Sequence, residues 1–471
     1  MKMKPLSLSV ALMGCVLAGH AAAAGYHFGT QSVSAQATAN ASAAEAADAT
    51  TVFYNAAGMT RLKGTHLSGA LNLVAPSVEY NNAKATTALG RPIAGSNSGK
   101  ITSDLIAVPH FYLTHQLNDT MTAGLGVYVP FASATEYQRD SVLRYNVNQT
   151  ELTTIDINPT IAFKLNDQHS VAVGVIAQYA DASLRQYADF GTTADKINAA
   201  RGVATQFGGS GLLDGFAEVS GNDWGWGFNL GWLWEIDQNT RVGLSYRSPI
   251  KHTLSGDAKW TVPSGSATQN QVGALVASYG YRTSDVSVDI ETPESLSLHG
   301  FRQINPKWAV MGDLTWTKHS RFDVANIVYA LPKNAPMGTA NATTLVPNWS
   351  DSWKLSIGGT YQVNDPLQLR FGVAYDKSPV PSADYRLSTM PDNDRIWLSV
   401  GGKYDLNKQS SVNFAYSYIF IKDASANVNG YCGGGSPASG SAKACVSSYT
   451  KGSADFDSHA HILGVQYNYA F

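Results

Sequence analysis

The last eleven residues, 461–471, alternate between two kinds of side chain. The large ones occupy every second position: His461, Leu463, Val465, Tyr467, Tyr469 and Phe471. Because successive side chains of a strand point to opposite faces, this segment predicts a strand with one aromatic and aliphatic face and one small or polar face. An aromatic outer face suits a barrel strand in lipid, and a terminal Phe is the usual end of a bacterial outer-membrane barrel. The alternative is an edge strand of a soluble β-sandwich.

The first 23 residues have the three parts of a secretory signal peptide. Two lysines precede an apolar run over 6–17, and small residues follow over 18–25. An Ala-x-Ala rule places the cleavage after Ala23, so we expect 1–23 to be removed. Cys15 lies in a stretch that loosely resembles a lipoprotein cleavage box, which is the alternative.

The rest of the chain contains no stretch of roughly 18–20 unbroken apolar residues, the length that a membrane helix requires. In lipid only helices and closed sheets satisfy every backbone hydrogen-bonding group, so an integral membrane protein without such a helix must be a closed β-barrel. The formal net charge of −2 gives no electrostatic reason to expect nucleic acid as a partner. The predicted location is the outer membrane of a Gram-negative bacterium.

Short turn sequences recur between alternating segments. Residues that favour tight turns occur at 117–119, 165–167, 236–239, 304–306, 363–365 and 406–408. Six such turns imply twelve strands, and strands near 65–80 and 460–471 bring the count to fourteen. We expect long loops at the other rim, over 188–222, 259–284, 326–348 and 424–454. This asymmetry predicts an all-β fold, a transmembrane antiparallel up-and-down barrel of about 14 strands.

A segment rich in Ala, Ser and Thr, 24–61, precedes the first strand. Its side chains are too small for a strand that faces lipid and too apolar for a solvated tail. A barrel of this width can hold such a segment in its lumen. We therefore expect an N-terminal plug, or hatch, over 24–61 and the transmembrane barrel over 62–471. The alternative for 24–61 is a disordered periplasmic leader.

Two cysteines, Cys432 and Cys445, remain after removal of the signal peptide. In an oxidising compartment they most simply form one disulfide that closes a surface loop. Two thiols without a histidine pattern make a poor zinc site, so we expect neither a metal nor a cofactor. The histidines show no spacing with Ser or Asp that would predict a catalytic set, so we do not expect an enzyme.

Five motifs carry a family resemblance. They are Gly-Asn-Asp-Trp-Gly-Trp-Gly-Phe-Asn at 221–229, Ser-Tyr-Arg-Ser at 245–248, Asp-Lys-Ser-Pro-Val-Pro at 376–381, Pro-Asp-Asn-Asp-Arg-Ile-Trp-Leu-Ser at 391–399, and Asn55, Ala56, Ala57 and Gly58 in the expected plug. With these motifs the mature chain resembles the FadL-type outer-membrane long-chain fatty acid transporters, a family that also includes aromatic-hydrocarbon uptake channels. The family's plug motif is Asn-Pro-Ala, so Ala56 stands where the family has proline.

The resemblance implies passive inward diffusion of a hydrophobic small molecule, most simply a long-chain fatty acid. The ligand would be caught among extracellular loops, pass to a tighter internal pocket and leave sideways through a gap in the third strand. The protein would act as a monomer surrounded by outer-membrane lipid and lipopolysaccharide, with no cofactor and no nucleic acid. A monoaromatic hydrocarbon is the alternative substrate, because both kinds of molecule need an apolar path.

The third expected strand, 122–137, contains Pro130. Proline has no N–H to give to a strand ladder, so a central barrel strand should not contain it unless a gap or bulge is needed there. We therefore expect a lateral gate at Gly126, Pro130 and Phe131. The alternative is that Pro130 lies near the extracellular rim, where strand pairing is already ending.

Several charged residues of the expected strands point inward by alternation. The candidates for polar contacts in the lumen or for contact with a ligand carboxylate are Arg247, Arg370, Arg395, Asp376 and Asp394. Inward arginines and carboxylates mostly pair with one another or with the plug, since a buried charge needs a partner. In the alternative, one arginine binds a fatty-acid carboxylate, for which the planar guanidinium is well suited.

The predicted loops 188–222 and 259–284 carry apolar side chains that would otherwise be exposed, with helical spacing over 190–216. Such side chains can form a ligand-capture groove. The candidates are Phe190, Phe207, Leu212, Leu213, Phe216, Val272 and Leu275. Long loops also fit an adhesin. A general porin is a further alternative, although it needs a wide polar lumen without a plug.

Overall fold

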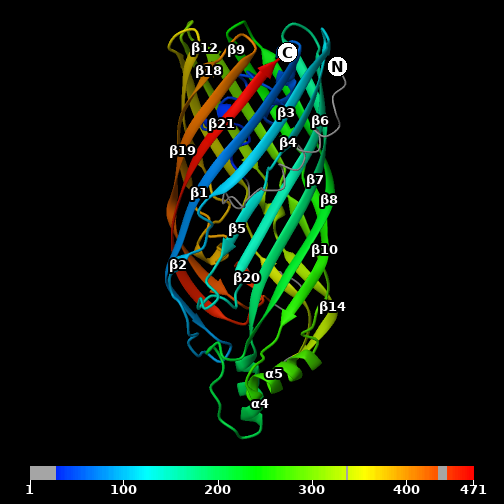
Figure 1. Ribbon diagram of the computed structural model, residues 1–471, viewed down its shortest axis with the longest axis vertical. Helices are drawn as coiled ribbons and strands as arrows, with labels where there is room; N and C mark the ends of the chain where they lie inside the picture. The colour runs from blue at the N-terminus through cyan, green and yellow to red at the C-terminus, as the bar shows by residue number, and fades with distance from the viewer. Residues whose placement is uncertain (1–27, 336–337, 433–442) are drawn as a thin grey trace.

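The computed structural model describes residues 28–335, 338–432 and 443–471. It is a tall barrel with short turns at one rim and two helices beyond the other, α4 (Phe190–Ala200) and α5 (Ala267–Ser278) (Figure 1). The predicted signal peptide lies outside the described residues. Within the described part of the chain, no helix is long and apolar enough to cross a membrane.

The described strands form one antiparallel sheet that closes into a barrel of fourteen strands, as the sequence predicts. Nine run without interruption: β1 (Thr65–Thr86), β3 (Ile106–Asn118), β6 (Gln149–Lys164), β7 (His169–Asp189), β8 (Asp214–Glu235), β17 (Leu367–Asp376), β18 (Arg395–Asp405), β19 (Ser410–Asn429) and β21 (Lys451–Ala470). Five consist of two labelled strands each: β4 (Met121–Tyr128) with β5 (Ala132–Glu136), β9 (Thr240–Arg247) with β10 (Ile250–Thr261), β11 (Ser284–Thr292) with β12 (Ser295–Gln303), β13 (Trp308–Thr317) with β14 (Ala325–Ala335), and β15 (Gly338–Val346) with β16 (Ser352–Gln362). Two short strands, β2 (Gly99–Lys100) and β20 (Cys445–Val446), pair with β1 and β15.

The barrel closes because its first and last strands pair. β1 pairs with β21 from His66 opposite Ala470 to Thr86 opposite Lys451. The other side of β21 pairs with β19. A closed sheet has no free edge, which is the condition for a strand structure in lipid.

The wall has the two faces that the sequence predicts. Along β21 the side chains of Leu463 and Val465 are exposed on the outer face, whereas Ile462 and Gln466 are buried inside. β17 alternates in the same way. Near the short turns, aromatic rings pack in pairs, as in an interfacial aromatic belt: Trp232 with Trp234, Trp308 with Tyr361, and Tyr467 with Tyr469.

All six predicted turns connect neighbouring strands, but the prediction of the long loops is partly wrong. β7 and β8 stay paired as far as Asp189 opposite Asp214, and most of the predicted loop 326–348 belongs to β14 and β15. Exposed strand ends tolerate Gly, Ser and Asn when their backbone groups remain paired, so composition alone did not reveal these extensions. The short helix η3 (His319–Arg321) lies in the break between β13 and β14, and η4 (Ala383–Tyr385) lies in the connection between β17 and β18.

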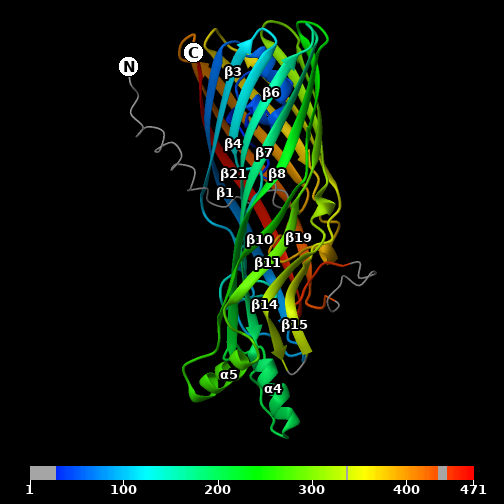
Figure 2. The same ribbon diagram turned by 90° about the vertical axis from the view of Figure 1, so that its right-hand side faces the viewer.

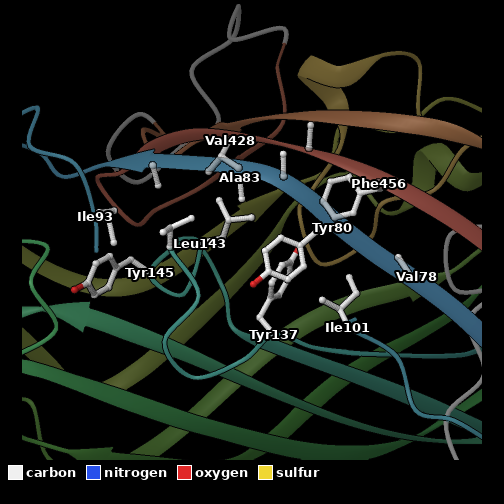
Figure 3. Packing of buried hydrophobic residues seen from close by; sticks show 14 of the residues in the cluster. Val78, Tyr80, Ala83, Ile93, Ile101, Tyr137, Leu143, Tyr145, Val428 and Phe456 are labelled. Carbon is white, nitrogen blue, oxygen red and sulfur yellow. The ribbon is translucent and has the colours of Figure 1, made fainter. Parts of the chain in front are cut away.

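The end of the lumen opposite the short turns is closed by apolar side chains. Residues 137–148 fold inward. Their side chains Tyr137, Leu143 and Tyr145 pack in one cluster with residues of β1 and β21 (Figure 3). Tyr80, Tyr137, Leu143, Tyr145 and Phe456, here called the outer cluster, are all buried. Because the long connections of outer-membrane barrels face the cell exterior, this end is the extracellular one.

The N-terminal segment, Phe28–Arg61, lies inside the barrel near the short turns (Figure 2). It contains α2 (Val33–Gln36), α3 (Thr51–Tyr54) and the 3-10 helix η2 (Ala56–Arg61). Most of its side chains are buried. Small residues on both sides permit the close approach: a Cβ on Gly372 of β17 would lie 2.2 Å from the carbonyl carbon of Thr38.

Candidate functional site

The third barrel strand is broken at Pro130. β4 ends at Tyr128 and β5 begins at Ala132. Among the described strands β4 pairs with β3, whereas β5 pairs only with β6. Ile106–His110 of β3 therefore pairs with β1, and no described strand pairs with its other side. We call this interruption between β3 and β5 the wall gap. Just before the break, Gly126 has no room for a side chain, because a Cβ there would lie 2.8 Å from the Tyr128 ring.

The first described residues, Phe28–Gln31, lie in the wall gap and are here called the arm. The N–H of Phe28 donates to the carbonyl of Pro130 at 2.8 Å, and the side-chain amide of Gln31 donates to the carbonyl of Val129 at 2.8 Å. The Phe28 ring stacks on the imidazole of His110, with 6.0 Å between ring centroids. Two hydrogen bonds and a ring contact thus close the wall where a strand ladder would otherwise do so.

A cavity of about 110 Å³ lies in the lumen beside the arm, with Pro130 and Phe131 at its edge. Since one water needs roughly 10–15 Å³ on a comparable measure, the cavity can hold a small ligand or part of a larger one. Phe53, Ile176 and Ile250 supply apolar lining. The charged lining residues are two cations and three carboxylates: Arg247, Lys354, Asp156, Asp313 and Asp376.

Arg247 is held in the cavity by neighbours from three elements. Its Nη2 donates to Asp156 Oδ2 at 3.1 Å and to the hydroxyl of Tyr128, and its guanidinium lies 4.5 Å from the Phe53 ring centroid. Its Nη1 is buried and has no hydrogen-bond partner among the described residues. A buried donor without a partner is costly, so this N–H group is suited to an anionic ligand.

Lys354 of β16 is a cavity residue that our sequence analysis missed. Its Nζ lies 4.1 Å from the Trp397 ring centroid and 3.5 Å from the carbonyl oxygen of Gly29 in the arm. Trp353 and Leu355, on either side of it, are exposed on the outer face. Alternation alone therefore places Lys354 inward, as it does the predicted arginines.

The other predicted arginines do not line the cavity. Arg370 makes hydrogen bonds of 2.8 and 2.9 Å to the two carboxylate oxygens of Glu45 in the N-terminal segment. Arg395 pairs with Asp392. Both contacts agree with the interpretation that inward-pointing charged residues pair with one another or with charged residues of the N-terminal segment. Of the two predicted carboxylates, Asp376 lines the cavity.

The prediction that Asp394 contacts the lumen is wrong. Its carboxylate accepts hydrogen bonds from the Tyr375 hydroxyl at 2.7 Å and from Lys377 Nζ at 3.2 Å. Tyr375 is exposed on the outer face. Because Arg395 is buried inside, the period of two places its neighbour Asp394 on the outer side of the wall.

The motif at 55–58 joins the N-terminal segment to the wall. The side-chain amide of Asn55 donates to the carbonyl of Trp232 at 2.9 Å, and its nitrogen lies 2.7 Å from His299 Nε2. Asn55 Oδ1 accepts from the N–H of Ala57 at 3.1 Å, so the same side chain also caps η2. A Cβ on Gly58 would lie 2.5 Å from a neighbouring side chain, so this position requires glycine.

The predicted capture residues lie in different environments. Phe190 and Leu213 are buried, so the prediction that they form an exposed apolar surface is wrong for these two. Phe190 is the first residue of α4, directly after β7, and it packs edge-on against Tyr281 with 4.8 Å between ring centroids and lies 6.4 Å from the Trp260 ring of β10. Leu212 is exposed. The partly exposed ones are Phe207, Phe216, Val272 and Leu275.

A disulfide joins Cys432 and Cys445, whose Cα atoms lie 5.6 Å apart. It closes a loop whose middle, 433–442, lies outside the described residues. In the described ranges, no cluster of His, Cys, Asp and Glu side chains could hold a metal ion.

The barrel, the N-terminal segment inside it and the wall gap agree with a comparison of sequences. Residues 14–471 match the model of the family described as outer membrane protein transport protein (OMPP1/FadL/TodX). The chain belongs to this family. It is an outer-membrane channel for hydrophobic substrates.

Individual relatives cover most of the chain. A protein of Neisseria meningitidis serogroup B that is named as an outer-membrane protein is 47% identical over 99% of both chains. The long-chain fatty acid transport protein of Escherichia coli K12 is 28% identical over 82% of this chain and 84% of its own. A FadL homologue from Pseudomonas aeruginosa superposes with a TM-score of 0.79 at 22% identity, covering 95% of this chain and 100% of that one. The Ralstonia pickettii toluene transporter superposes with a TM-score of 0.60 at 17% identity, covering 90% and 94%. These likenesses to solved structures establish the fold.

Proposed function

We propose that this channel takes up long-chain fatty acids and releases them sideways into the outer membrane through the wall gap. The single observation that carries the choice of substrate is the unpartnered Nη1 of Arg247 at the cavity. A guanidinium makes a strong, charge-assisted hydrogen bond to a carboxylate. Lys354, the second cation of the cavity, can hold the other carboxylate oxygen.

In this proposal the two ends of the lumen have different tasks. Leu212 and the partly exposed loop residues make the first contact with ligand at the extracellular end. The N-terminal segment is the plug predicted for 24–61, and it keeps the periplasmic end closed. The channel works as a monomer in contact with outer-membrane lipid and lipopolysaccharide, and the concentration gradient drives transport.

The arm is weakly enough held to open thermally. Five hydrogen bonds hold it: the N–H of Phe28 and the side-chain amide of Gln31 donate to the carbonyls of Pro130 and Val129, the backbone N–H of Gln31 donates to the Tyr54 hydroxyl, and the Tyr112 hydroxyl and Lys354 Nζ donate to the carbonyls of Gln31 and Gly29. Each contributes about 1 kcal/mol, and burial of the Phe28 side chain contributes about 1.5–3 kcal/mol. A total of roughly 6.5–8 kcal/mol leaves on the order of one molecule in 10⁵–10⁶ open at any moment. An opening in the wall lets an apolar molecule reach lipid without crossing the aqueous periplasm.

A monoaromatic hydrocarbon is the second candidate substrate, and the size of the cavity favours it. The volume of about 110 Å³ suits a single ring better than a whole long acyl chain, since an apolar cavity of roughly 150 Å³ holds benzene. A hydrocarbon would have no use for the free N–H of Arg247. A fatty acid therefore needs the N–H of Arg247 in this cavity, whereas a hydrocarbon needs only its apolar lining.

The experiment compares oleate with toluene as substrates of one variant. Arg247→Met is combined with Asp156→Asn, so that no buried carboxylate loses its ionic partner. In a deletion strain that carries this double variant, we expect the oleate concentration for half-maximal uptake to rise at least roughly tenfold. Toluene uptake should stay unchanged. The reverse pattern, with toluene uptake lost and oleate uptake kept, would favour the hydrocarbon.

A further inference from the structure

His110 of β3 is a buried titratable group that the proposed route does not use. Its side chain faces the lumen and is 3% exposed. Neither ring nitrogen has a hydrogen-bond partner among the described residues. Ala70 is its partner in β1, Val108 and Tyr112 flank it on the same face of β3, and Phe28 stacks on its ring. An imidazole in apolar surroundings with both nitrogens unpaired is costly, so another function must account for its position.

His110 stands at the point where the wall stops being continuous. The next residue, Phe111, is the first of β3 that pairs with β4, whereas among the described strands Ile106–His110 pairs with β1 alone. Phe28 of the arm covers the imidazole from the side of the wall gap. When the arm leaves the wall gap, the imidazole is uncovered at its edge. A molecule that leaves sideways therefore passes this ring.

A fatty acid needs a polar partner at this point. Bringing a carboxylate into hydrocarbon is prohibitively costly, so the acid must leave as the neutral carboxylic acid. A neutral carboxyl group still has an O–H donor and a C=O acceptor, and both lose water in the wall gap. A neutral imidazole offers one N–H donor and one acceptor nitrogen, which match those of the acid in kind.

We infer that His110 is a binding site for the neutral carboxyl group of a fatty acid that leaves through the wall gap. This inference rests on the proposed function, both on the fatty acid as substrate and on the lateral route. The carboxylate is protonated by hydronium from the bulk solvent before it enters the wall gap, and His110 supplies hydrogen bonds only. The Oε1 atom of Gln31 is also buried and unpartnered among the described residues, but it belongs to the arm and moves with it.

The test compares an acid with its ester. The variants His110→Leu, His110→Gln and Thr114→Val are expressed in a deletion strain, and initial uptake rates of oleate and methyl oleate are measured. Thr114 is the matched control: it lies on the same face of β3 and is buried and unpartnered like His110. Unlike His110, Thr114 lies outside the wall gap, where β3 and β4 are continuously paired, because Thr114 pairs with Gly124 of β4. A heat-dependent shift in gel mobility checks that each variant folds.

We expect His110→Leu to lower oleate uptake roughly tenfold, the effect of losing one hydrogen bond, and to leave methyl oleate uptake within about twofold of wild type. His110→Gln keeps a donor and an acceptor and should restore most of the oleate uptake. Thr114→Val should change neither rate. An equal loss for acid and ester, or no loss for either, would overturn the inference. Wild-type protein that takes up the ester but no oleate would overturn the fatty-acid proposal, and this inference with it.

Discussion

The two ends of the lumen are closed by different chemistry. At the extracellular end the outer cluster packs apolar and aromatic side chains, among them Leu143 and Phe456. At the periplasmic end the N-terminal segment is tied to the wall by polar contacts. Besides the Arg370–Glu45 pair, the side-chain amide of Gln466 donates to Asp48 at 2.9 Å.

The difference indicates which closure can open for an apolar ligand. Apolar side chains can move aside for an apolar ligand, because their contacts with one another are then replaced by apolar contacts with the ligand. Opening the polar closure would leave buried charges without partners, which costs far more. An apolar ligand therefore passes the outer cluster more easily than the N-terminal segment. The lateral route that we propose through the wall gap avoids breaking these charged contacts.

The largest effect is expected from breaking the polar contacts that tie the N-terminal segment to the wall. Arg370→Ala leaves the Glu45 carboxylate, whose side chain is only 12% exposed, without its partner and should lower the free energy of unfolding by about 3–5 kcal/mol. The loosened N-terminal segment should admit water, so single-channel conductance in planar bilayers should rise. The double variant Glu45→Ala/Arg370→Ala should recover part of the loss, because neither charge is then left alone. Unchanged conductance in Arg370→Ala would show that this pair does not hold the closure.

A somewhat smaller effect is expected at the outer cluster, which closes the extracellular end. Leu143→Ala removes a side chain that is 1% exposed and should lower the free energy of unfolding by about 2–5 kcal/mol. Its neighbours remain apolar, so the conductance should stay low and oleate uptake should not fall. A rise in conductance as large as that of Arg370→Ala would remove the contrast between the two closures.

The smallest effect is expected beyond the outer cluster, where Asp195 of α4 organises the following loop. Its carboxylate accepts hydrogen bonds from Thr205 Oγ1 at 2.7 Å and from the N–H groups of Phe207 and Gly208 at 2.9 Å each, and it pairs with Arg91 at 2.6 Å. Burial raises the pKa of Asp195, but these partners more than offset burial and hold the pKa below its usual range.

The pH dependence follows from that direction. A depressed pKa in the folded state gives stability that is present above the unfolded value of about 3.9 and is lost as the pH falls through the folded value. We expect the loop at 201–209 to stay resistant to an acid-stable protease at the unfolded value of about pH 3.9 and to become sensitive only at lower pH. Asp195→Asn weakens the same contacts by about 1.5–3 kcal/mol and should expose the loop at neutral pH as well. Equal cleavage of wild type and variant at every pH would contradict this assignment.

The outer face of the wall could be predicted from the sequence, because it depends on a period of two and on nothing else. The same period gave the terminal strand with Phe471, and the missing N–H of Pro130 predicted where a strand would break. The contacts made by side chains inside the lumen could not be predicted to the same extent. Alternation places Arg247 and Arg370 inward but does not say which one meets Glu45, since that depends on how the N-terminal segment folds. The burial of Phe190 likewise depends on Tyr281 and Trp260, which are distant in sequence.

The wall gap can be tested directly by closing it. In a background with Cys432→Ser and Cys445→Ser, one cysteine is placed within Ile106–His110 of β3 and another within Ala132–Glu136 of β5. A reducible thiol crosslinker then joins the two strands. The control places the same crosslink across the continuous ladder at Leu113 and Leu125, which are partners in β3 and β4.

We expect the protein crosslinked across the wall gap to fold and to bind oleate, but to lose oleate uptake until the crosslinker is reduced. The control crosslink should leave uptake unchanged. Undiminished uptake with the crosslink across the wall gap fully formed would contradict the account, because the ligand would then leave past the N-terminal segment.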